Sequence, residues 1–367
     1  MAKKIMIVFG TRSEAIKLVP LIYKLKQYTQ IKLTTCLTAQ HRETINQVLI
    51  HFNVNPDYDL NIMTKNQPLT DLSIHLLTKM DELLKKIKPD IILVHGDSST
   101  TFIASLAAFY NCIPVGQVEA GLRTFDKFSS SLEKLNKQLT DIIADLHFAP
   151  TELAAKNLIK ENKPTKSIFI TGNTIIDTLN MTLDKNYYHP VFNSVKNKKL
   201  ILLTIHRKEN LNKIDEIFNV IQKIIHKFQD VIILYPVPLN PEIQKKAKFF
   251  LGNQERIIFT SPLSIYDFHN LIAKSYLILT DSRGIQEKAP SLNVPVVILG
   301  NATERPEGLE TGASVLVGTK PDNIYTKVYD LLTNPVVYKE MSNAINPYGN
   351  GNASEKIIRI ILKYLGI

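Results

Sequence analysis

The chain has 367 residues, of which 44% are hydrophobic and 21% charged, which is typical of a globular protein with about two domains. Two cysteines, Cys36 and Cys112, exclude a disulfide framework, and no apolar run reaches the roughly 18 residues of a membrane span. The net charge of +10 comes from scattered lysines, without a basic helix that interleaves aromatic residues, so we expect no nucleic-acid or membrane partner. The start of the sequence lacks the long apolar region of a secretory signal, which favours a cytoplasmic protein.

Short apolar strands alternate with helical patterns through the first half of the chain. Runs of β-branched residues predict strands, and apolar residues three and four apart predict helices. The expected strands are 4–9, 31–37, 90–94, 113–118, 146–149 and 167–171, and the expected helices are 14–26, 102–110 and 152–160. This alternation predicts a parallel sheet covered by helices.

A polar stretch at 184–198 has no clear period and predicts a domain boundary, after which the alternation resumes. The second set of strands is 200–204, 231–235, 256–259, 276–280, 294–299 and 314–317, and its helices are 214–227, 243–250, 265–273, 286–289, 322–332 and 355–365. We therefore expect doubly wound α/β domains over 1–184 and 197–353, with the last helix, 354–367, packing back on the first domain. Tandem domains of this kind place a ligand in the cleft at the carboxyl ends of their strands.

The loops after the expected strands collect charged and hydroxyl side chains, and such loops often carry function. These side chains are Arg12, Asp97, Glu119, His206, Arg207, Ser282 and Arg305. The patterns GxGxxG and GxxxxGK[ST] are absent, which argues against a dinucleotide site and a P-loop NTPase. HExxH is also absent and the cysteines lie far apart, so we expect no protein-bound metal.

Nine segments carry a further signal along the whole length of the chain. They are FGTRSEAIKLVPL (9–21), TAQHRETINQVL (38–49), HGDSSTTF (95–102), VEAGLRT (118–124), TGNTIIDTL (171–179), TIHRKEN (204–210), YPVPLNP (235–241), TDSRGIQEKAPSL (280–292) and TERPEGLETG (303–312). In this order, they resemble the non-hydrolysing UDP-N-acetylglucosamine 2-epimerase family. One segment alone would be weak, whereas nine in the family's order form a specific signal.

The resemblance implies two Rossmann-like domains in the arrangement of the GT-B glycosyltransferases, the second of them binding the nucleotide. It implies inversion at C2 of UDP-GlcNAc to give UDP-ManNAc, with a UDP-sugar as the partner and no organic cofactor. It also implies a homodimer that supplies precursors of surface polysaccharides.

Such a reaction makes definite chemical demands on the site. The C2 proton is poorly acidic because no carbonyl adjoins it, so a feasible route eliminates UDP to a glycal and adds it back on the other face. The leaving diphosphate needs cations and backbone N–H groups, and the C2 proton needs carboxylates on opposite faces of the sugar.

By the resemblance, Asp97, Glu119 and Glu133 form the acid–base set, and His206 is the essential histidine near the diphosphate. The residues matched to the nucleotide site are Arg12, Lys17, Phe268, Ser282, Arg283, Gly284, Lys288 and Arg305. Phe268 would flank the uracil, and Ser282 would offer a hydroxyl and an N–H group to phosphate. A second nucleotide-sugar region, allosteric in bacterial members, matches Gln40, His41 and Gln67, with an ordinary structural loop as the alternative.

Each of these residues also has a structural alternative. Asp97 precedes four hydroxyl residues and suits a helix cap, whereas Glu119 suits a turn and Glu133 a solvated helix surface. His206 suits a packed polar position, and the arginines suit surface ion pairs. The full-length resemblance favours the functional alternative, least strongly at Glu133, whose surroundings diverge from the family's.

Several positions depart from the family's pattern. Its Pro-Glu-Glu-x-Asn-Arg block is LEKLNK here, which places Lys134 at the second carboxylate and Lys137 at the arginine that forms a bidentate fork. Its Asp-Ser-Gly-Gly-Ile-Gln-Glu-Glu block is DSRGIQEK, which places Arg283 beside the diphosphate. The glutamate that accepts from the ribose hydroxyls is replaced by Lys288, which cannot accept a hydrogen bond.

These departures leave more than one function open. The chain is expected to be a UDP-GlcNAc 2-epimerase, with reduced activity or a different UDP-sugar as an alternative. A catalytically silent member that binds nucleotide sugar is a second reading, which Arg283 keeps open. A GT-B glycosyltransferase acting on an acceptor is a third, but the carboxylate set and the His206-Arg207 pair favour the epimerase.

Overall fold

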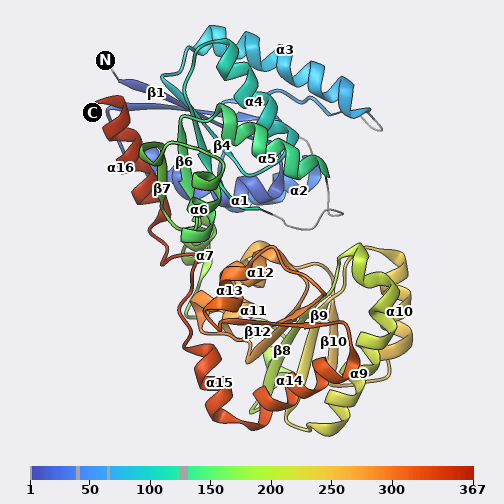
Figure 1. Cartoon of the computed structure of the whole chain (residues 1–367). Coiled ribbons are helices and arrows are strands. Elements are labelled where there is room, and N and C mark those ends of the chain that lie inside the picture. Colours follow the sequence, from blue (N-terminus) through green and yellow to red (C-terminus); the bar gives the residue numbers. More distant parts are fainter. Residues whose placement is uncertain (1, 39–41, 64–66, 124–130) are drawn as a thin grey trace. The chain divides into compact units, whose positions relative to one another are not determined.

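The computed structural model describes residues 2–38, 42–63, 67–123 and 131–367 (Figure 1). The chain divides into two compact units, Met1–Met181 with Tyr348–Ile367, and Thr182–Pro347. Each unit holds one parallel sheet with helices packed on it, which confirms the prediction of two Rossmann-like α/β domains. Within the described ranges, no helix has both the length and the apolar character that crossing a membrane requires.

The first unit is built on a seven-stranded sheet of order β3-β2-β1-β4-β5-β6-β7. Its strands are β1 (Lys3–Phe9), β2 (Ile31–Leu37), β3 (Tyr58–Asp59), β4 (Ile91–His95), β5 (Val115–Val118), β6 (Leu146–Ala149) and β7 (Ile168–Ile170). Every residue of β4 and β5 is buried, so both faces of the central sheet are covered. This explains why these strands are continuous apolar runs rather than alternating ones.

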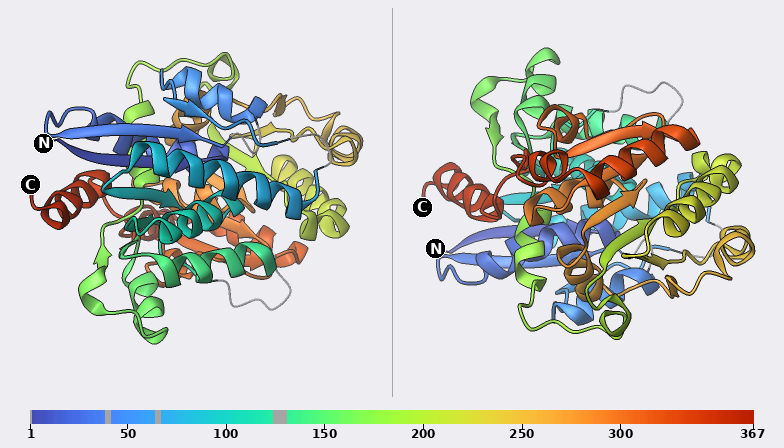
Figure 2. Two further views of the ribbon diagram at one scale, coloured as in Figure 1. Left: turned by 90° about the horizontal axis from the view of Figure 1, so that it is seen from above. Right: turned by 90° about the horizontal axis from the view of Figure 1, so that it is seen from below.

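Helices cover this sheet, and the last of them comes from the far end of the chain. They are α1 (Arg12–Leu25), α2 (Arg42–His51), α3 (Leu69–Ile87), α4 (Ser99–Tyr110), α5 (Ser131–Ile143), α6 (Glu152–Lys160), α7 (Thr174–Thr182), α16 (Ala353–Leu365) and the 3-10 turn η1 (Thr165–Ser167). Helix α16 packs against α1, and it ends close to the start of β1 in every view (Figure 1 and Figure 2).

A buried carboxylate holds the beginning of α16. Asp177 in α7 accepts hydrogen bonds from the backbone N–H groups of Ala353 at 3.1 Å and Ser354 at 2.8 Å. Since the first N–H groups of a helix have no partner within the helix, this carboxylate satisfies two of them. The C-terminal helix is therefore an integral part of the first unit.

The second unit repeats the plan with a six-stranded sheet of order β10-β9-β8-β11-β12-β13. Its strands are β8 (Lys199–Thr204), β9 (Val231–Pro236), β10 (Ile257–Thr260), β11 (Leu277–Thr280), β12 (Val296–Leu299) and β13 (Ser314–Gly318). Its helices are α8 (Phe192–Val195), α9 (Ile214–Lys227), α10 (Pro241–Leu251), α11 (Ile265–Ala273), α12 (Arg283–Lys288), α13 (Pro306–Glu310), α14 (Pro321–Thr333) and α15 (Pro335–Ser342), with 3-10 turns η2 (Lys208–Lys213) and η3 (Ala289–Leu292).

Both sheets reverse their strand order at one place. In the first unit the reversal lies between β1 and β4, and in the second it lies between β8 and β11. All the recorded strand pairs within the two sheets are parallel, so the strands end on the same edge. Open parallel sheets bind ligands at such a reversal, outside the carboxyl ends of the strands. The loops after these four strands are therefore the places to look for a site.

The structure also contains elements that the sequence patterns did not predict. Helices α2 and α3 and the two-residue edge strand β3 fill the stretch between the strands expected at 31–37 and 90–94. Helix α12 begins at Arg283, three residues before the expected start at Gln286. Helix α4 begins at Ser99, three residues before the expected start at Phe102, because the Ser98 hydroxyl caps it by accepting from the N–H of Thr101 at 3.1 Å.

Candidate active site

The loop after β1 is closely packed and firmly held. A Cβ atom on Gly10 would lie 2.1 Å from Thr38 Oγ1 and 2.4 Å from Thr100 Oγ1, so only glycine fits there. Glu14 Oε2 accepts from the N–H groups of Gly10 at 2.6 Å and Thr11 at 3.0 Å, and Glu14 completes a capping box with Thr11. Burial raises the pKa of Glu14, against the opposing effect of its hydrogen bonds.

Arg12 stands at the first position of α1 on this rigid loop. Its side chain is half-buried, and burial lowers its pKa. Among the residues that the structure describes, no carboxylate forms an ion pair with it. A partly desolvated cation at the start of a 14-residue helix is suited to bind an anion, since the helix dipole adds to its charge.

Glu119 directly follows β5 and is buried. Its backbone lies in the left-handed region at φ 64°, so the turn expected there is present. Its side chain is nevertheless tied to two neighbours: Lys17 Nζ forms an ion pair with Oε2, and Asn173 Nδ2 donates to the same oxygen at 2.8 Å. Lys17, which is expected at the nucleotide, thus pairs with a carboxylate of the expected acid–base set.

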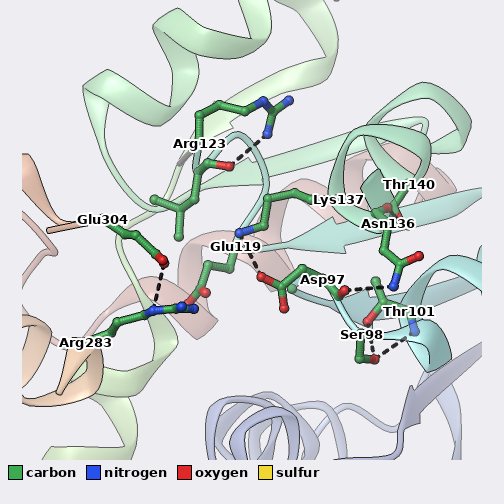
Figure 3. Close-up of polar contacts among 12 residues, drawn as sticks. Asp97, Ser98, Thr101, Glu119, Arg123, Asn136, Lys137, Thr140, Arg283 and Glu304 are labelled. Atoms are coloured by element: carbon green, nitrogen blue, oxygen red, sulfur yellow. Dashed lines mark hydrogen bonds and ion pairs between the residues drawn. The ribbon is translucent and has the colours of Figure 1, made fainter. Parts of the chain in front are cut away.

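Asp97 lies in the loop between β4 and α4, and it is paired with the lysine that departs from the family's pattern. Lys137 Nζ lies 3.1 Å from Asp97 Oδ2, and Asn136 Nδ2 donates to the Asp97 carbonyl at 3.2 Å (Figure 3). Burial raises the pKa of Asp97, but the charge and hydrogen bond of Lys137 outweigh it and leave the pKa below its ordinary value. Since Ser98 caps α4, the alternative role of Asp97 as that cap is wrong.

The remaining residues expected in the first unit lie elsewhere. Glu133 is in the exposed first turn of α5, so it does not share the burial of Glu119. Gln67 is close to His75, with 3.0 Å between Nε2 and Nδ1 on the surface. Gln40 and His41 lie outside the described residues.

Asp281 organises the second unit at its strand reversal. It follows β11, is 1% exposed, and accepts from the backbone N–H groups of His206 at 3.0 Å and Arg207 at 2.9 Å, beyond the end of β8. Asn210 Nδ2 donates to the same carboxylate at 3.1 Å. Burial raises the pKa of Asp281, but the hydrogen bond and charge of His206 outweigh it and leave the pKa below its ordinary value.

His206 is therefore held by one ring nitrogen. Its Nδ1 lies 2.9 Å from Asp281 Oδ1, and its side chain is 52% exposed. A carboxylate on Nδ1 fixes the ring orientation and leaves Nε2 as the nitrogen that meets a ligand. The alternative of a merely packed polar histidine does not fit this exposure.

The segment after Asp281 begins α12. The Ser282 N–H donates to Thr280 Oγ1 at 2.9 Å, and the Ser282 hydroxyl makes no capping bond. Arg283 replaces a glycine of the family's pattern. Its Nε lies 2.8 Å from Glu304 Oε2, so it pairs with a carboxylate of its own unit (Figure 3). A Cβ atom on Gly284 would meet nothing within 4 Å, so close packing does not require the second glycine.

Lys288, which replaces a glutamate of the family's pattern, is buried beside the rings of His269 and Phe268. Its Nζ lies 2.9 Å from His269 Nε2 and 5.2 Å from the centre of the Phe268 ring. His269 Nδ1 in turn lies 2.7 Å from Thr182 Oγ1. The structure thus brings together Phe268, which was matched to the uracil, and Lys288, which was matched to the ribose.

Arg305 is also buried, and its Nε lies 2.6 Å from Glu287 Oε1. The expected alternative of a surface ion pair is therefore wrong for this arginine. The described ranges contain no group of three or more histidine, cysteine or acidic residues that could hold a metal ion.

Comparison with known proteins gives these sites a context. The family model for UDP-N-acetylglucosamine 2-epimerase matches residues 23–362. A UDP-N-acetylglucosamine 2-epimerase of Bacillus subtilis (strain 168) is 52% identical over 99% of this chain and 96% of its own. The chain belongs to the UDP-N-acetylglucosamine 2-epimerase family.

Two solved structures of this family are similar over nearly the full length. The Neisseria meningitidis UDP-GlcNAc 2-epimerase bound to UDP-GlcNAc has 42% identity and a TM-score of 0.89, covering 98% of this chain and 100% of that one. The Methanocaldococcus jannaschii UDP-GlcNAc 2-epimerase in complex with UDP-GlcNAc and UDP has 35% identity and a TM-score of 0.81, covering 98% and 99%.

The structure adds three residues to those that the sequence singled out: His95, Asn173 and Asp281. All three lie within segments that carry the family resemblance. Their position in those segments was the only available signal, because sequence spacing does not show which side chains meet across a sheet.

We expect Asp281→Asn to destabilise the protein in a pH-dependent way. The amide would place a donor or a weaker acceptor against two backbone N–H groups, which costs about 1–3 kcal/mol at neutral pH. Because the folded pKa of Asp281 is depressed, its stabilising effect is present above the unfolded value of about 3.9 and is lost as pH falls through the folded pKa. Urea denaturation between about pH 7 and pH 2 measures the difference.

Asp322→Asn is the matched control, since Asp322 is exposed in the first turn of α14. It should change the free energy of unfolding little at any pH. An Asp281→Asn deficit that stayed constant down to the lowest pH would contradict the role assigned to the ionised carboxylate.

Proposed function

We propose that this chain interconverts UDP-GlcNAc and UDP-ManNAc by eliminating UDP to a glycal and adding it back. The observation that carries this proposal is the pair of carboxylates Asp97 and Glu119. They follow adjacent parallel strands, because His95 of β4 is registered with Val118 of β5, and each carboxylate has its own lysine. The relatives named above support the substrate.

The two carboxylates are proposed to carry the C2 proton on opposite faces of the sugar. Lys137 keeps Asp97 ionised, which suits a base, and Glu119 is held by Lys17 and Asn173. Positioned general bases contribute about 10²–10⁴-fold to a rate. Glu133 stays a prediction as the third member of the set.

The leaving diphosphate is proposed to be stabilised by cations and by the second unit. Arg12 offers a guanidinium at a helix start, with no ion-pair partner in the part of the chain that the structure describes, and His206 offers Nε2 while Asp281 holds Nδ1. The Ser282 hydroxyl is proposed to contact phosphate, and Arg305, fixed by Glu287, completes the site. Cations at a leaving group act where charge develops in the transition state.

The NMR spectrum of UDP-GlcNAc in heavy water tests this function. We expect the C2 proton to exchange for deuterium and a second anomeric signal to grow as the manno product forms. Asp97→Asn and Glu119→Gln should each lower the rate by about 10²-fold or more, because each removes a base that reaches the substrate. An unchanged spectrum with the native chain would contradict the epimerase and favour a silent binding protein.

Glu133→Gln tests whether the third carboxylate belongs to the acid–base set with Asp97 and Glu119. A loss as large as that of Asp97→Asn would support its place in the set, and native turnover would remove it from the set. Thermal unfolding of each variant shows whether a lost rate reflects lost fold, since Glu133 is exposed and its replacement should leave stability unchanged.

The departures at positions 283 and 288 are proposed to weaken nucleotide binding. Arg283 is engaged by Glu304, and Lys288 stands under Phe268 with only hydrogen-bond donors to offer a ribose. An unpaired pair of ribose hydroxyls costs about 1–3 kcal/mol, roughly 10- to 100-fold in affinity. We therefore expect Arg283→Gly combined with Lys288→Glu to bind UDP at least about 10-fold more tightly by calorimetry.

A matched control makes the same change of charge on exposed helices: Lys339→Ala combined with Lys245→Glu. It should leave the affinity for UDP unchanged. If the double variant at 283 and 288 also bound UDP like the native chain, these two positions would not be limiting the site.

A homodimer is proposed through the first unit. An apolar groove of about 300 Å³ lies among α3, α4 and α5, and the exposed side chains at its rim are apolar. They are Leu69, Ile74, Leu132 and Leu135. Contiguous exposed apolar surface of this kind usually marks an interface.

Leu135→Glu should convert the dimer to a monomer in sedimentation experiments at micromolar concentration, because it places a charge in the groove. Ile159→Glu is the matched control, since Ile159 is 47% exposed on α6 outside the groove. A native chain that sediments as a monomer, or a Leu135→Glu chain that stays dimeric, would contradict this interface. The cytoplasmic location stays a prediction.

A further inference from the structure

His95, the last residue of β4, is a buried histidine that the proposed reaction has not used. Its side chain is 3% exposed, and neither ring nitrogen has a hydrogen-bond partner among the described residues. Burying an unpaired polar group costs free energy, so each such group in a folded protein calls for an explanation.

The surroundings of His95 suggest that explanation. Its Nε2 lies 3.5 Å from Glu119 Oε2, the oxygen that also receives Lys17 and Asn173. A charge on the imidazole also lowers the pKa of two further carboxylates that face it. The charged groups around the ring are Glu14 and Lys17 on α1, Glu119 after β5, and Asp97 after β4 with its partner Lys137 on α5.

These contacts hold one oxygen of Glu119. Oε2 is approached by the Lys17 ammonium from α1, the Asn173 amide from the loop before α7 and the His95 ring from β4. An oxygen with three donors around it is anchored and carries the negative charge.

We propose that His95 is a positioning residue for Glu119, which directs an Nε2–H group at Oε2 and so keeps the carboxylate ionised and correctly turned. This inference rests on the proposed function and deepens it. When the Glu119 carboxylate takes the C2 proton, the C–H electron pair forms the C1–C2 double bond and the C1–O pair leaves with UDP. UDP then adds back at C1, and the double-bond pair takes a proton on the opposite face of C2. That proton comes from solvent through Asp97, while Glu119 returns its own proton to solvent.

A second buried histidine of the same sheet provides the matched control. His147 in β6 is 1% exposed, and its Nδ1 also has no hydrogen-bond partner among the described residues. Its Nε2, however, is satisfied by the carbonyl of Asp141 at 2.9 Å. Both histidines are therefore equally buried, but only His95 faces a carboxylate of the proposed acid–base set.

The test compares His95→Phe, His95→Asn and His147→Asn by kcat and KM for UDP-GlcNAc across pH. Phenylalanine keeps the ring without a donor, whereas asparagine keeps an N–H donor that does not titrate. We expect His95→Phe to lower kcat about 10- to 100-fold, as loss of an orienting partner does, with KM little changed. His95→Asn should recover part of kcat at neutral pH.

The pH profile separates this role from a structural one. His95→Phe removes an N–H donor that faces the ionised Glu119, so its acid limb of kcat should move to higher pH, and His95→Asn, which keeps a donor, should move the limb less. His147→Asn should leave the limb in place even if it lowers thermal stability. Native kcat in His95→Phe, or an equal fall in both His95 variants with the acid limb unmoved, would overturn the proposal.

A readout independent of turnover completes the test. In the nitrogen-labelled ring spectrum, Glu119→Gln should shift the Nε2 resonance of His95, because a neutral amide replaces the carboxylate that faces it. The ring resonances of His147 should not move, and an unmoved Nε2 resonance of His95 would overturn the pairing. Absence of turnover by the native chain would overturn the proposed function and the role of His95 in it, while the ring spectrum would still decide the pairing.

Discussion

Both units depend on a buried carboxylate that accepts backbone N–H groups at the reversal of strand order. In the first unit Glu14 binds the loop after β1, and in the second Asp281 binds the loop after β8. These bonds fix the backbone from which Arg12 and His206 project. The pKa values of the two carboxylates shift in opposite directions. Burial dominates at Glu14 and raises its pKa, whereas the hydrogen bond and charge of His206 lower the pKa of Asp281.

Much of the fold could be predicted from the sequence, because the strands of a doubly wound sheet are short apolar runs bounded by turn residues. β2 and β6 have the expected bounds, and so do α6, α9 and α11. Elements without such signals were missed. Helix α3 begins after Pro68 without a side-chain cap, and β3 is a two-residue edge strand too short to show a period.

The candidate site was less predictable, because its chemistry arises from contacts across the sheet. Sequence resemblance selected Glu119 and Lys17 separately, but only the fold shows that they form an ion pair. Likewise the hydroxyl-rich run after Asp97 indicated a cap, whereas Ser98 performs that role and frees the carboxylate for Lys137. The burial of His95 has no signature in its sequence neighbourhood.

The order in which the units can be completed during synthesis follows from the position of α16. The second unit is one continuous stretch, whereas the first unit needs the final residues of the chain to satisfy Asp177. At roughly 5–20 residues per second, synthesis of α16 follows that of the main body of the first unit by about 10–40 s. The first unit is thus the later of the two to reach its finished form, although most of it is made earlier. Until then, the face of α1 that receives α16 stays uncovered.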